Sequence, residues 1–218
     1  MANARLRATV VFVALALLFP GLATAAPEVV YDNMTTFTSG TYAPNGFWPF
    51  SQFAPNEPQG DHIDLTGTCR VATEFDLLLS STQAVTLSTV TLSFHPFDAD
   101  LMEVGAAFWT TTLTDVHVDG PTAVIFTVPN VTVPDSLIWI VSADSHVAGL
   151  ATCNPPTVGS SGDYFWDRDT YDGQWYPLWF ENNPVANFGA RVLAVPEPAT
   201  TAALLAAAGL LAGRRRRR

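Results

Sequence analysis

Apolar residues recur at every second position over most of residues 63–79, with mostly polar residues between them up to Asp76, and this period of two constrains the fold more than any other feature of the chain. Positions 63, 65, 69, 71, 73, 75, 77 and 79 hold Ile, Leu, Cys, Val, Thr, Phe, Leu and Leu. Because successive side chains of a β-strand point to opposite faces, the pattern predicts a strand or strand pair with one buried face. Residues 26–195 show no sustained helical periodicity, so we expect an all-β domain.

Short apolar runs continue along the chain at a spacing that is typical of β-sandwiches. The further strand candidates are residues 90–94, 104–109, 113–118, 124–128, 137–142 and 187–193. Asp119-Gly120-Pro121 predicts a turn between two of them, because glycine and proline suit the backbone angles of tight turns. The predicted architecture is therefore a β-sandwich.

The first twenty-five residues have the order of a secretory signal peptide. Arg5 and Arg7 precede an apolar run at residues 8–19, and small residues follow. Ala23 and Ala25 satisfy the A-x-A rule for signal peptidase, so we place the cleavage after Ala25. The chain is therefore expected to cross the inner membrane through the Sec machinery.

Three segments with different physical properties follow residue 195. Pro196-Glu197-Pro198 should stay extended, since proline fixes φ and removes a backbone donor. Residues 199–213 are uncharged and rich in alanine and leucine, which predicts a transmembrane helix. At about 1.5 Å per residue this helix reaches roughly 22 Å, less than the ~30 Å hydrocarbon core. We expect it to anchor the protein briefly, with a cytoplasmic membrane stop made by Arg214, Arg215, Arg216, Arg217 and Arg218.

Val195-Pro196-Glu197-Pro198-Ala199-Thr200 resembles the PEP-CTERM sorting signal, found in Gram-negative bacteria that make exopolysaccharide. The resemblance covers about twenty-four residues, including the apolar segment and the arginines. It implies that an exosortase, a membrane-embedded cysteine-dependent protease or transpeptidase, cuts at or near the motif. Pro196, Glu197 and Pro198 would then be substrate residues, and residues 196–218 a sorting tail.

About 170 residues lie between the two predicted signals, which suits a single domain at residues 26–195. Several of its segments resemble a domain often found ahead of PEP-CTERM tails. These segments are residues 60–65, 70–76, 124–129, 159–166 and 187–191. This second resemblance implies a jelly-roll-like β-sandwich and no particular activity.

Acidic side chains dominate residues 26–195, which hold nineteen aspartates and glutamates, three arginines and no lysine. The resulting net charge of about −16 repels nucleic acid and anionic membranes. It also repels acidic polysaccharide unless cations bridge the two. We therefore expect no nucleic-acid partner.

Cys69 and Cys153 are the only cysteines of the chain. Export would place them in an oxidising compartment, which predicts a disulfide between them. Closing the loop of about 85 residues between them would stabilise the protein by roughly 4 to 5 kcal/mol in the chain-entropy model. The alternative, a catalytic thiol, lacks a recognisable histidine and amide partner in the sequence.

Aromatic residues are concentrated in residues 164–180, interleaved with aspartates. Exposed Trp166, Trp175 and Trp179 could stack on sugar rings, with neighbouring carboxylates accepting hydrogen bonds from sugar hydroxyls. The other interpretation is that these bulky side chains plug one end of the sandwich, because tryptophan is usually largely buried. Both interpretations remain open from the sequence.

Asp167, Asp169 and Asp172 form a candidate calcium loop, because hard cations bind clustered carboxylate oxygens. The EF-hand pattern fails at Tyr171, so only a calcium site of another type would fit. The four histidines share no metal-ligand spacing, and no other cofactor is indicated. No catalytic residue can be named, because carboxylate pairs are abundant in so acidic a chain.

These observations favour an exported, non-enzymatic protein of the cell surface or extracellular matrix, associated with exopolysaccharide or biofilm. The inner membrane would hold it only transiently. One alternative is a carbohydrate-binding module that uses residues 164–180. The other is a secreted hydrolase whose carboxylates assemble in space.

Overall fold

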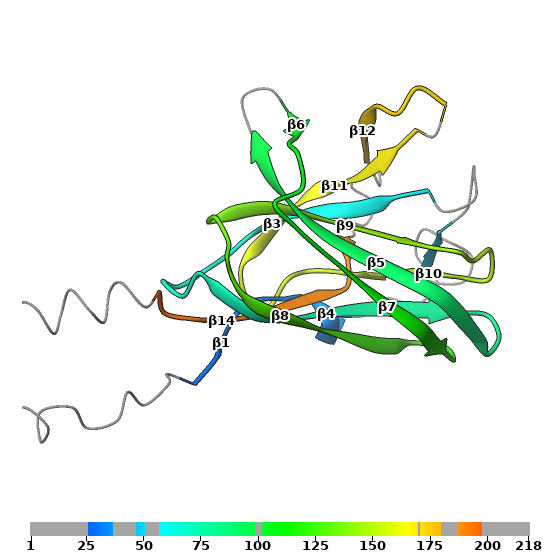
Figure 1. The fold of residues 1–218 in the computed structure, drawn as a ribbon, viewed down its shortest axis with the longest axis horizontal. Helices are drawn as coiled ribbons and strands as arrows, with labels where there is room; N and C mark the ends of the chain where they lie inside the picture. The colour runs from blue at the N-terminus through cyan, green and yellow to red at the C-terminus, as the bar shows by residue number, and fades with distance from the viewer. Residues whose placement is uncertain are drawn as a thin grey trace, which may run out of the picture.

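Two curled antiparallel sheets pack face to face in the computed structural model, and the predicted all-β class is confirmed (Figure 1). The structure describes residues 26–36, 47–50, 57–98, 102–169, 171–179 and 187–197. Within these ranges the helical content is a single 3-10 turn, η1 (Met34–Thr36). None of the helical segments described is long and apolar enough to span a membrane. The predicted signal peptide, residues 1–25, and the predicted helix at residues 199–213 lie outside the described residues.

The first sheet has the order β1-β14-β4-β10-β13, with β2 paired to β10 and β8 paired to β4. Its strands are β1 (Glu28–Asp32), β2 (Phe47–Pro49), β4 (Val71–Ser81), β8 (Thr122–Thr132), β10 (Ala148–Cys153), β13 (Asn187–Phe188) and β14 (Ala190–Val195). The second sheet has the order β12-β11-β3-β9-β5-β6, with β7 paired to β5. Its strands are β3 (Gln59–Asp64), β5 (Val85–Asp98), β6 (Glu103–Val104), β7 (Trp109–Val118), β9 (Ser136–Ala143), β11 (Ser160–Arg168) and β12 (Trp175–Trp179).

The alternating segment forms the end of β3 and nearly all of β4, which lie in different sheets. Its apolar positions Phe75, Leu77 and Leu79 face the space between the sheets and are fully buried there. Trp139 of β9 meets them from the opposite sheet, with its ring centroid 5.6 Å from that of Phe75. The predicted turn at Asp119-Gly120-Pro121 joins β7 to β8. The predicted strand at residues 104–109 is wrong, because β6 ends at Val104 and β7 begins at Trp109.

Both ends of the domain leave from the same side of the first sheet. β14 lies between β1 and β4, with Glu28 opposite Ala194 and Val195 opposite Val71. Because β1 and β14 are antiparallel, the start of one strand lies beside the end of the other. Figure 1 shows β1 and β14 side by side where the chain enters and leaves the sandwich.

The predicted disulfide is not formed, because Cys69 and Cys153 are both free. Cys69 precedes β4 and faces the core between the sheets, where its thiol lies 3.3 Å from Glu28 Oε2. Cys153 ends β10 and packs against Leu78 in a separate cluster. Nine residues of nearly extended chain between Cys69 and Leu78 span about 30 Å, whereas a disulfide needs Cα atoms within about 7 Å.

Candidate functional site

The β11–β12 hairpin places the aromatic segment on the outer face of the second sheet. Tyr164 lies opposite Trp179 and Arg168 lies opposite Trp175 in the β-ladder. Since directly opposite residues share a face, these four side chains and that of Trp166 point away from the core. The hairpin forms the edge of the sheet, and Pro177 within β12 blunts that edge because it cannot donate to another strand.

A second apolar cluster forms on this outer face. Trp166 is fully buried in a cluster with Ile138 and Ile140 of β9, against which the side chains of Phe97 and Val104 pack from β5 and β6. Trp175 is half-buried against the same cluster, and the Arg168 guanidinium lies 5.8 Å from the centre of its ring. The arrangement explains why a sandwich carries tryptophan on its outer side: the end of β5 and β6 folds back to cover it.

The three tryptophans predicted to bind glycan therefore differ in accessibility. The prediction for Trp166 is wrong, because this side chain is a packing residue with no exposed surface. Trp175 offers part of its ring. Trp179 is 57 % exposed, and its ring centre lies 6.2 Å from that of Tyr164, which is half-buried. Of the three tryptophans, only Trp179 is more than half exposed, as sugar stacking requires.

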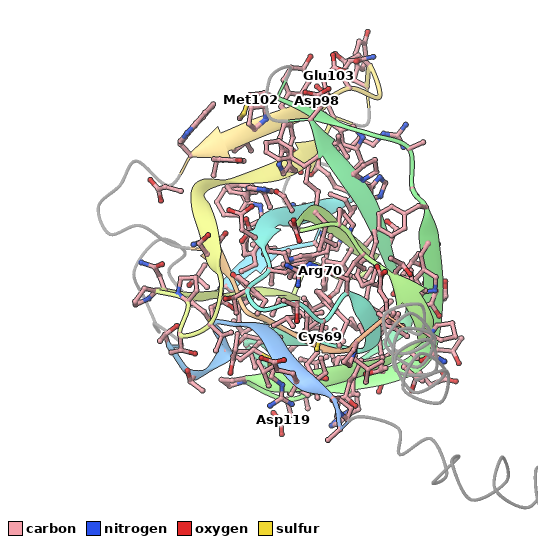
Figure 2. The ribbon with its side chains drawn as sticks, turned by 90° about the vertical axis from the view of Figure 1, so that its left-hand side faces the viewer. Cys69, Arg70, Asp98, Met102, Glu103 and Asp119 are labelled. Atoms are coloured by element: carbon pink, nitrogen blue, oxygen red, sulfur yellow. The ribbon has the colours of Figure 1, made fainter. Side chains whose placement is uncertain are left out.

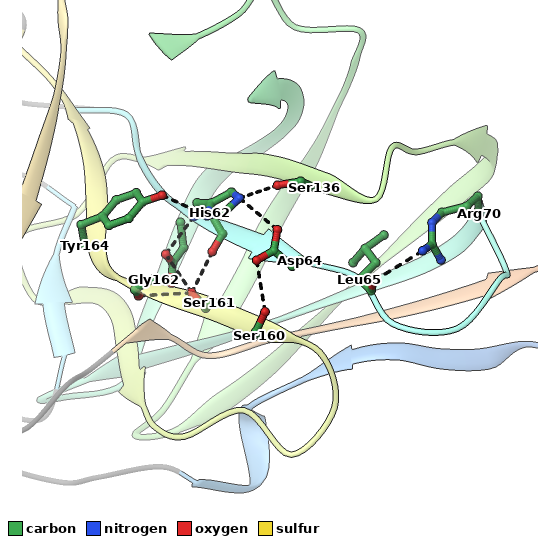
Figure 3. A network of polar contacts seen from close by, with 10 residues as sticks. His62, Asp64, Leu65, Arg70, Ser136, Ser160, Ser161, Gly162 and Tyr164 are labelled. Carbon is green, nitrogen blue, oxygen red and sulfur yellow. Dashed lines mark hydrogen bonds and ion pairs between the residues drawn. The ribbon is translucent and has the colours of Figure 1, made fainter. Parts of the chain in front are cut away.

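A polar network beside this cluster centres on His62 of β3 (Figure 3). His62 Nε2 lies 2.5 Å from Ser136 Oγ and 3.4 Å from Asp64 Oδ1, while Nδ1 lies 3.0 Å from the Tyr164 hydroxyl. Ser160 donates a hydrogen bond to the second oxygen of Asp64, at 3.1 Å. Burial lowers the pKa of His62, and the nearby Asp64 opposes this shift. The ring is therefore neutral at pH 7, with one nitrogen donating and one accepting.

This network differs from a catalytic triad. In a serine hydrolase triad the carboxylate holds the histidine nitrogen remote from the serine, which fixes the ring and stabilises its charge. Asp64 instead approaches the nitrogen that Ser136 also contacts, and a tyrosine holds the other one. The geometry supports a structural bridge between β3, β9 and β11 better than nucleophilic chemistry.

Sequence reasoning missed this network. The two-residue spacing of His62 and Asp64 places both on one face of a strand, which was a readable signal. Ser136 and Tyr164 come from β9 and β11, and nothing in the sequence indicated that they would meet His62. The register of β11 against β3 also shifts between Ser161 and Phe165.

On the inner face of the same sheet lie buried carboxyl groups. Asp61 is fully buried and accepts hydrogen bonds from the backbone N–H groups of His62, at 2.8 Å, and Phe188, at 3.0 Å. Burial raises the pKa of Asp61 well above its usual value. Burial and the nearby Glu57 raise the pKa of Asp167 to about 6. Glu57, Asp61 and Asp167 are all at least nine-tenths buried, so none is placed to meet a polysaccharide at the surface.

Asp167 gives the domain a measurable pH dependence. The pKa of Asp167 is higher in the folded state than in the unfolded state, where it is about 4. The stability of the folded protein is therefore greatest, as far as this group is concerned, below about pH 4, and it falls as the pH rises through about 6. We expect Asp167→Asn to raise the free energy of unfolding by about 2 to 3 kcal/mol at pH 7.5 and to leave it nearly unchanged at pH 4. Urea unfolding of both proteins across this range measures the difference. The pH dependence that His62 contributes to stability is present in both proteins and cancels in the comparison. An equal effect at the two pH values would contradict the assignment.

The predicted calcium loop does not gather its carboxylates. Asp167 faces the core, whereas Asp169 Oδ1 accepts the N–H of Tyr171 and Asp172 Oδ1 accepts the N–H of Gln174. The second oxygen of Asp172 accepts the Tyr176 hydroxyl, at 2.8 Å. Among the described residues no group of three acidic, histidine or cysteine side chains is arranged to hold a metal ion. Asp169 and Asp172 thus act as turn residues.

The predicted sorting motif begins directly after β14. Pro196 is exposed and Glu197 is half-buried. Pro198 and Arg214, Arg215, Arg216, Arg217 and Arg218 lie outside the described residues. Pro196, the first residue of the motif, thus follows the last strand directly, without a linker.

No protein-family model matches the chain, and no curated protein matches it.

Proposed function

We propose that this chain is an exported, non-enzymatic protein of the cell surface or extracellular matrix, in a bacterium that makes exopolysaccharide or biofilm. A signal peptide at residues 1–25 starts export, and an exosortase removes the tail at residues 196–218 after brief anchoring in the inner membrane. The finer fold within the all-β class is a jelly-roll-like sandwich. Its support is the order of strands that are distant in sequence, such as β14 between β1 and β4.

One observation carries the sorting proposal. The start of β1 and the end of β14 lie next to each other, with Glu28 opposite Ala194. A domain with adjacent ends can fold outside the membrane while the signal peptide at one end and the tail at the other still reach the same membrane. Had the two ends left from opposite sides, one segment would have had to pass around the whole sandwich.

The non-enzymatic part of the proposal has separate support. The His62 network lacks the order of a hydrolase triad, and Asp61 and Asp167 are buried. The acidic domain also disfavours nucleic acid and anionic partners.

Deletion of residues 196–218 tests the sorting proposal. We expect the full chain to be found with the cell surface and the truncated chain to be released unsorted, because the folded domain loses the segment that the exosortase reads. Fractionation and immunoblotting of cells carrying either form measure this. The control replaces Pro196-Glu197-Pro198 by three alanines and keeps the apolar segment. Equal surface delivery of all three forms would overturn the proposal.

A second candidate function, carbohydrate binding, is favoured by one observation: Trp179 is 57 % exposed beside Tyr164 at the edge of the second sheet. Aromatic faces of this kind offer an apolar surface next to polar groups. Binding of a neutral glycan fits the charge of the domain better than binding of an acidic one.

Trp179→Ala is the decisive variant for this candidate. We expect it to reduce the affinity for any glycan that the parent binds on a glycan array by at least tenfold, about 1.4 kcal/mol, because the stacking surface is removed. Tyr171→Ala is the matched control, since Tyr171 is 98 % exposed and lies in the turn of the same hairpin, whereas Tyr164 and Trp179 pair at the other end of its ladder. Equal loss in the two variants would show that stacking at Trp179 is not the basis of binding, and no binding by the parent would exclude this candidate.

A further inference from the structure

One end of the sandwich, which we call the termini end, is formed by the start of β1, the end of β14, the turn at residues 65–70 and Asp135. Figure 2 looks toward this side of the molecule, with Cys69 and Arg70 near its centre. Gly67 lies close to Glu28, because a Cβ on this glycine would be 3.3 Å from Glu28 Oε1. The turn therefore packs against the first strand where the chain enters the fold.

The turn at the termini end is firmly held. Arg70 Nε donates to Asp135 Oδ1 at 2.6 Å, and its guanidinium also donates to the carbonyls of Thr66, Gly67 and Cys69. These bonds satisfy the arginine, and the turn carries exposed, uncharged side chains at Thr66 and Thr68. The exposed carboxylates of Glu28 and Asp135 lie beside them. A polar surface of this kind is compatible with zwitterionic phospholipid headgroups, which carry a cationic group.

The chain beyond β14 limits how far this end can move from a membrane. Three residues, Pro196, Glu197 and Pro198, separate Val195 from the apolar segment that begins at Ala199. Four extended steps span at most about 14 Å. Val195 itself is held in the sheet opposite Val71, so lengthening this connection would require β14 to leave both β1 and β4.

We propose that the termini end lies against the phospholipid headgroups while the precursor is anchored, and that the turn at residues 65–70 is its contact. This inference rests on the proposed function, because it needs residues 199–213 to span the membrane. It also assigns an orientation: β4 runs eleven residues away from this end, about 35 Å, so the β4–β5 turn at residues 82–84 points away from the membrane. The exosortase would then meet Pro196 between the domain and the bilayer.

Position-specific quenching tests the orientation. The full chain carries a thiol-reactive fluorophore either at Thr66→Cys or at Gln83→Cys, two exposed turn positions at opposite ends of β4. It is reconstituted into phosphatidylcholine vesicles that contain a nitroxide-headgroup lipid. The unsubstituted chain, treated in the same way, gives the background from the two buried thiols. Thr132→Cys, at the exposed end of β8 opposite Val71, is a second position near the termini end.

We expect quenching at residues 66 and 132 to be several-fold greater than at residue 83. Equal quenching at the three positions, in a chain that floats with the vesicles, would overturn the orientation and leave the anchor intact. A chain that does not float with the vesicles would instead contradict the proposed anchoring. Thermal unfolding of each labelled chain identifies a variant that fails to fold, and the other position near the termini end then decides.

Discussion

Replacing Arg191 by methionine is expected to destabilise the domain by about 3 kcal/mol, because the substitution leaves the carboxylate of Asp76 buried without its partner. Arg191 and Asp76 lie opposite each other on β14 and β4, and Arg191 Nε donates to Asp76 Oδ2 at 2.7 Å. The arginine Nη2 contacts the same oxygen. The Asp76 side chain is 1 % exposed, so water cannot replace the lost donor. The Arg191 side chain is 39 % exposed, which places the effect at the low end of the usual range for a broken buried pair.

Urea unfolding at pH 7 measures this loss, and the double variant Asp76→Asn, Arg191→Met is its control. Removing the charge together with its partner should restore most of the stability, because the isolated buried charge is the main cost. An Arg191→Met variant as stable as the parent would show that the pair contributes nothing. A double variant no more stable than the single one would assign the effect to packing by the arginine stem.

Gly60→Ala is expected to have the other large effect, a loss of at least about 3 kcal/mol or failure to fold, at the upper end of the cost of overpacking. A Cβ at this position would lie 1.8 Å from the carbonyl oxygen of Trp139 and 2.8 Å from the Cα of Ile140. Both atoms belong to the backbone of β9, so no rotamer change can relieve the clash. The ladder between β3 and β9 would have to open, and the packing of Trp166 on the outer face would be lost with it.

Gly120→Asn is the matched control for this substitution. Gly120 has a φ of +61°, and a Cβ there would meet no atom within 4 Å. Asparagine tolerates the left-handed region better than most residues, so the variant should lose less than about 1 kcal/mol. Soluble yield and the thermal unfolding midpoint compare the two variants. A Gly60→Ala protein with the stability of the control would show that β3 and β9 can separate at little cost.

The features that could be predicted from the sequence were local ones. The alternation at Phe75, Leu77 and Leu79 predicted a buried strand face, because a period of two is a property of one strand. The turn at Asp119-Gly120-Pro121 was predicted because turn chemistry is also local. The predicted disulfide between Cys69 and Cys153 rested on the oxidising compartment expected after export and on the presence of only two cysteines. The prediction failed because Cys69 precedes β4 and packs between the sheets, whereas Cys153 ends β10 and packs beside Leu78, near the other end of β4, in a separate cluster.

The site was harder to predict because its members meet across strands. The burial of Trp166 depends on Phe97 and Val104, which the end of β5 and β6 bring onto the outer face of the sheet. His62 meets Ser136 and Tyr164 only through the order β11-β3-β9. A sequence shows which residues are aromatic or titratable, but the strand order decides which of them are covered.

The pairing of β1 with β14 also bears on when the domain can fold. The first strand forms its ladder with the last one, and Glu28 and Ala194 are 166 positions apart in the chain. Contacts this distant in sequence slow folding, because most of the loop-closure entropy must be lost before they form. A chain threaded through a membrane from its first residue cannot close this sheet until β14 has also emerged. If the chain is exported as proposed, this topology delays completion of the fold until translocation is nearly finished and keeps the chain in the unfolded form that threading needs.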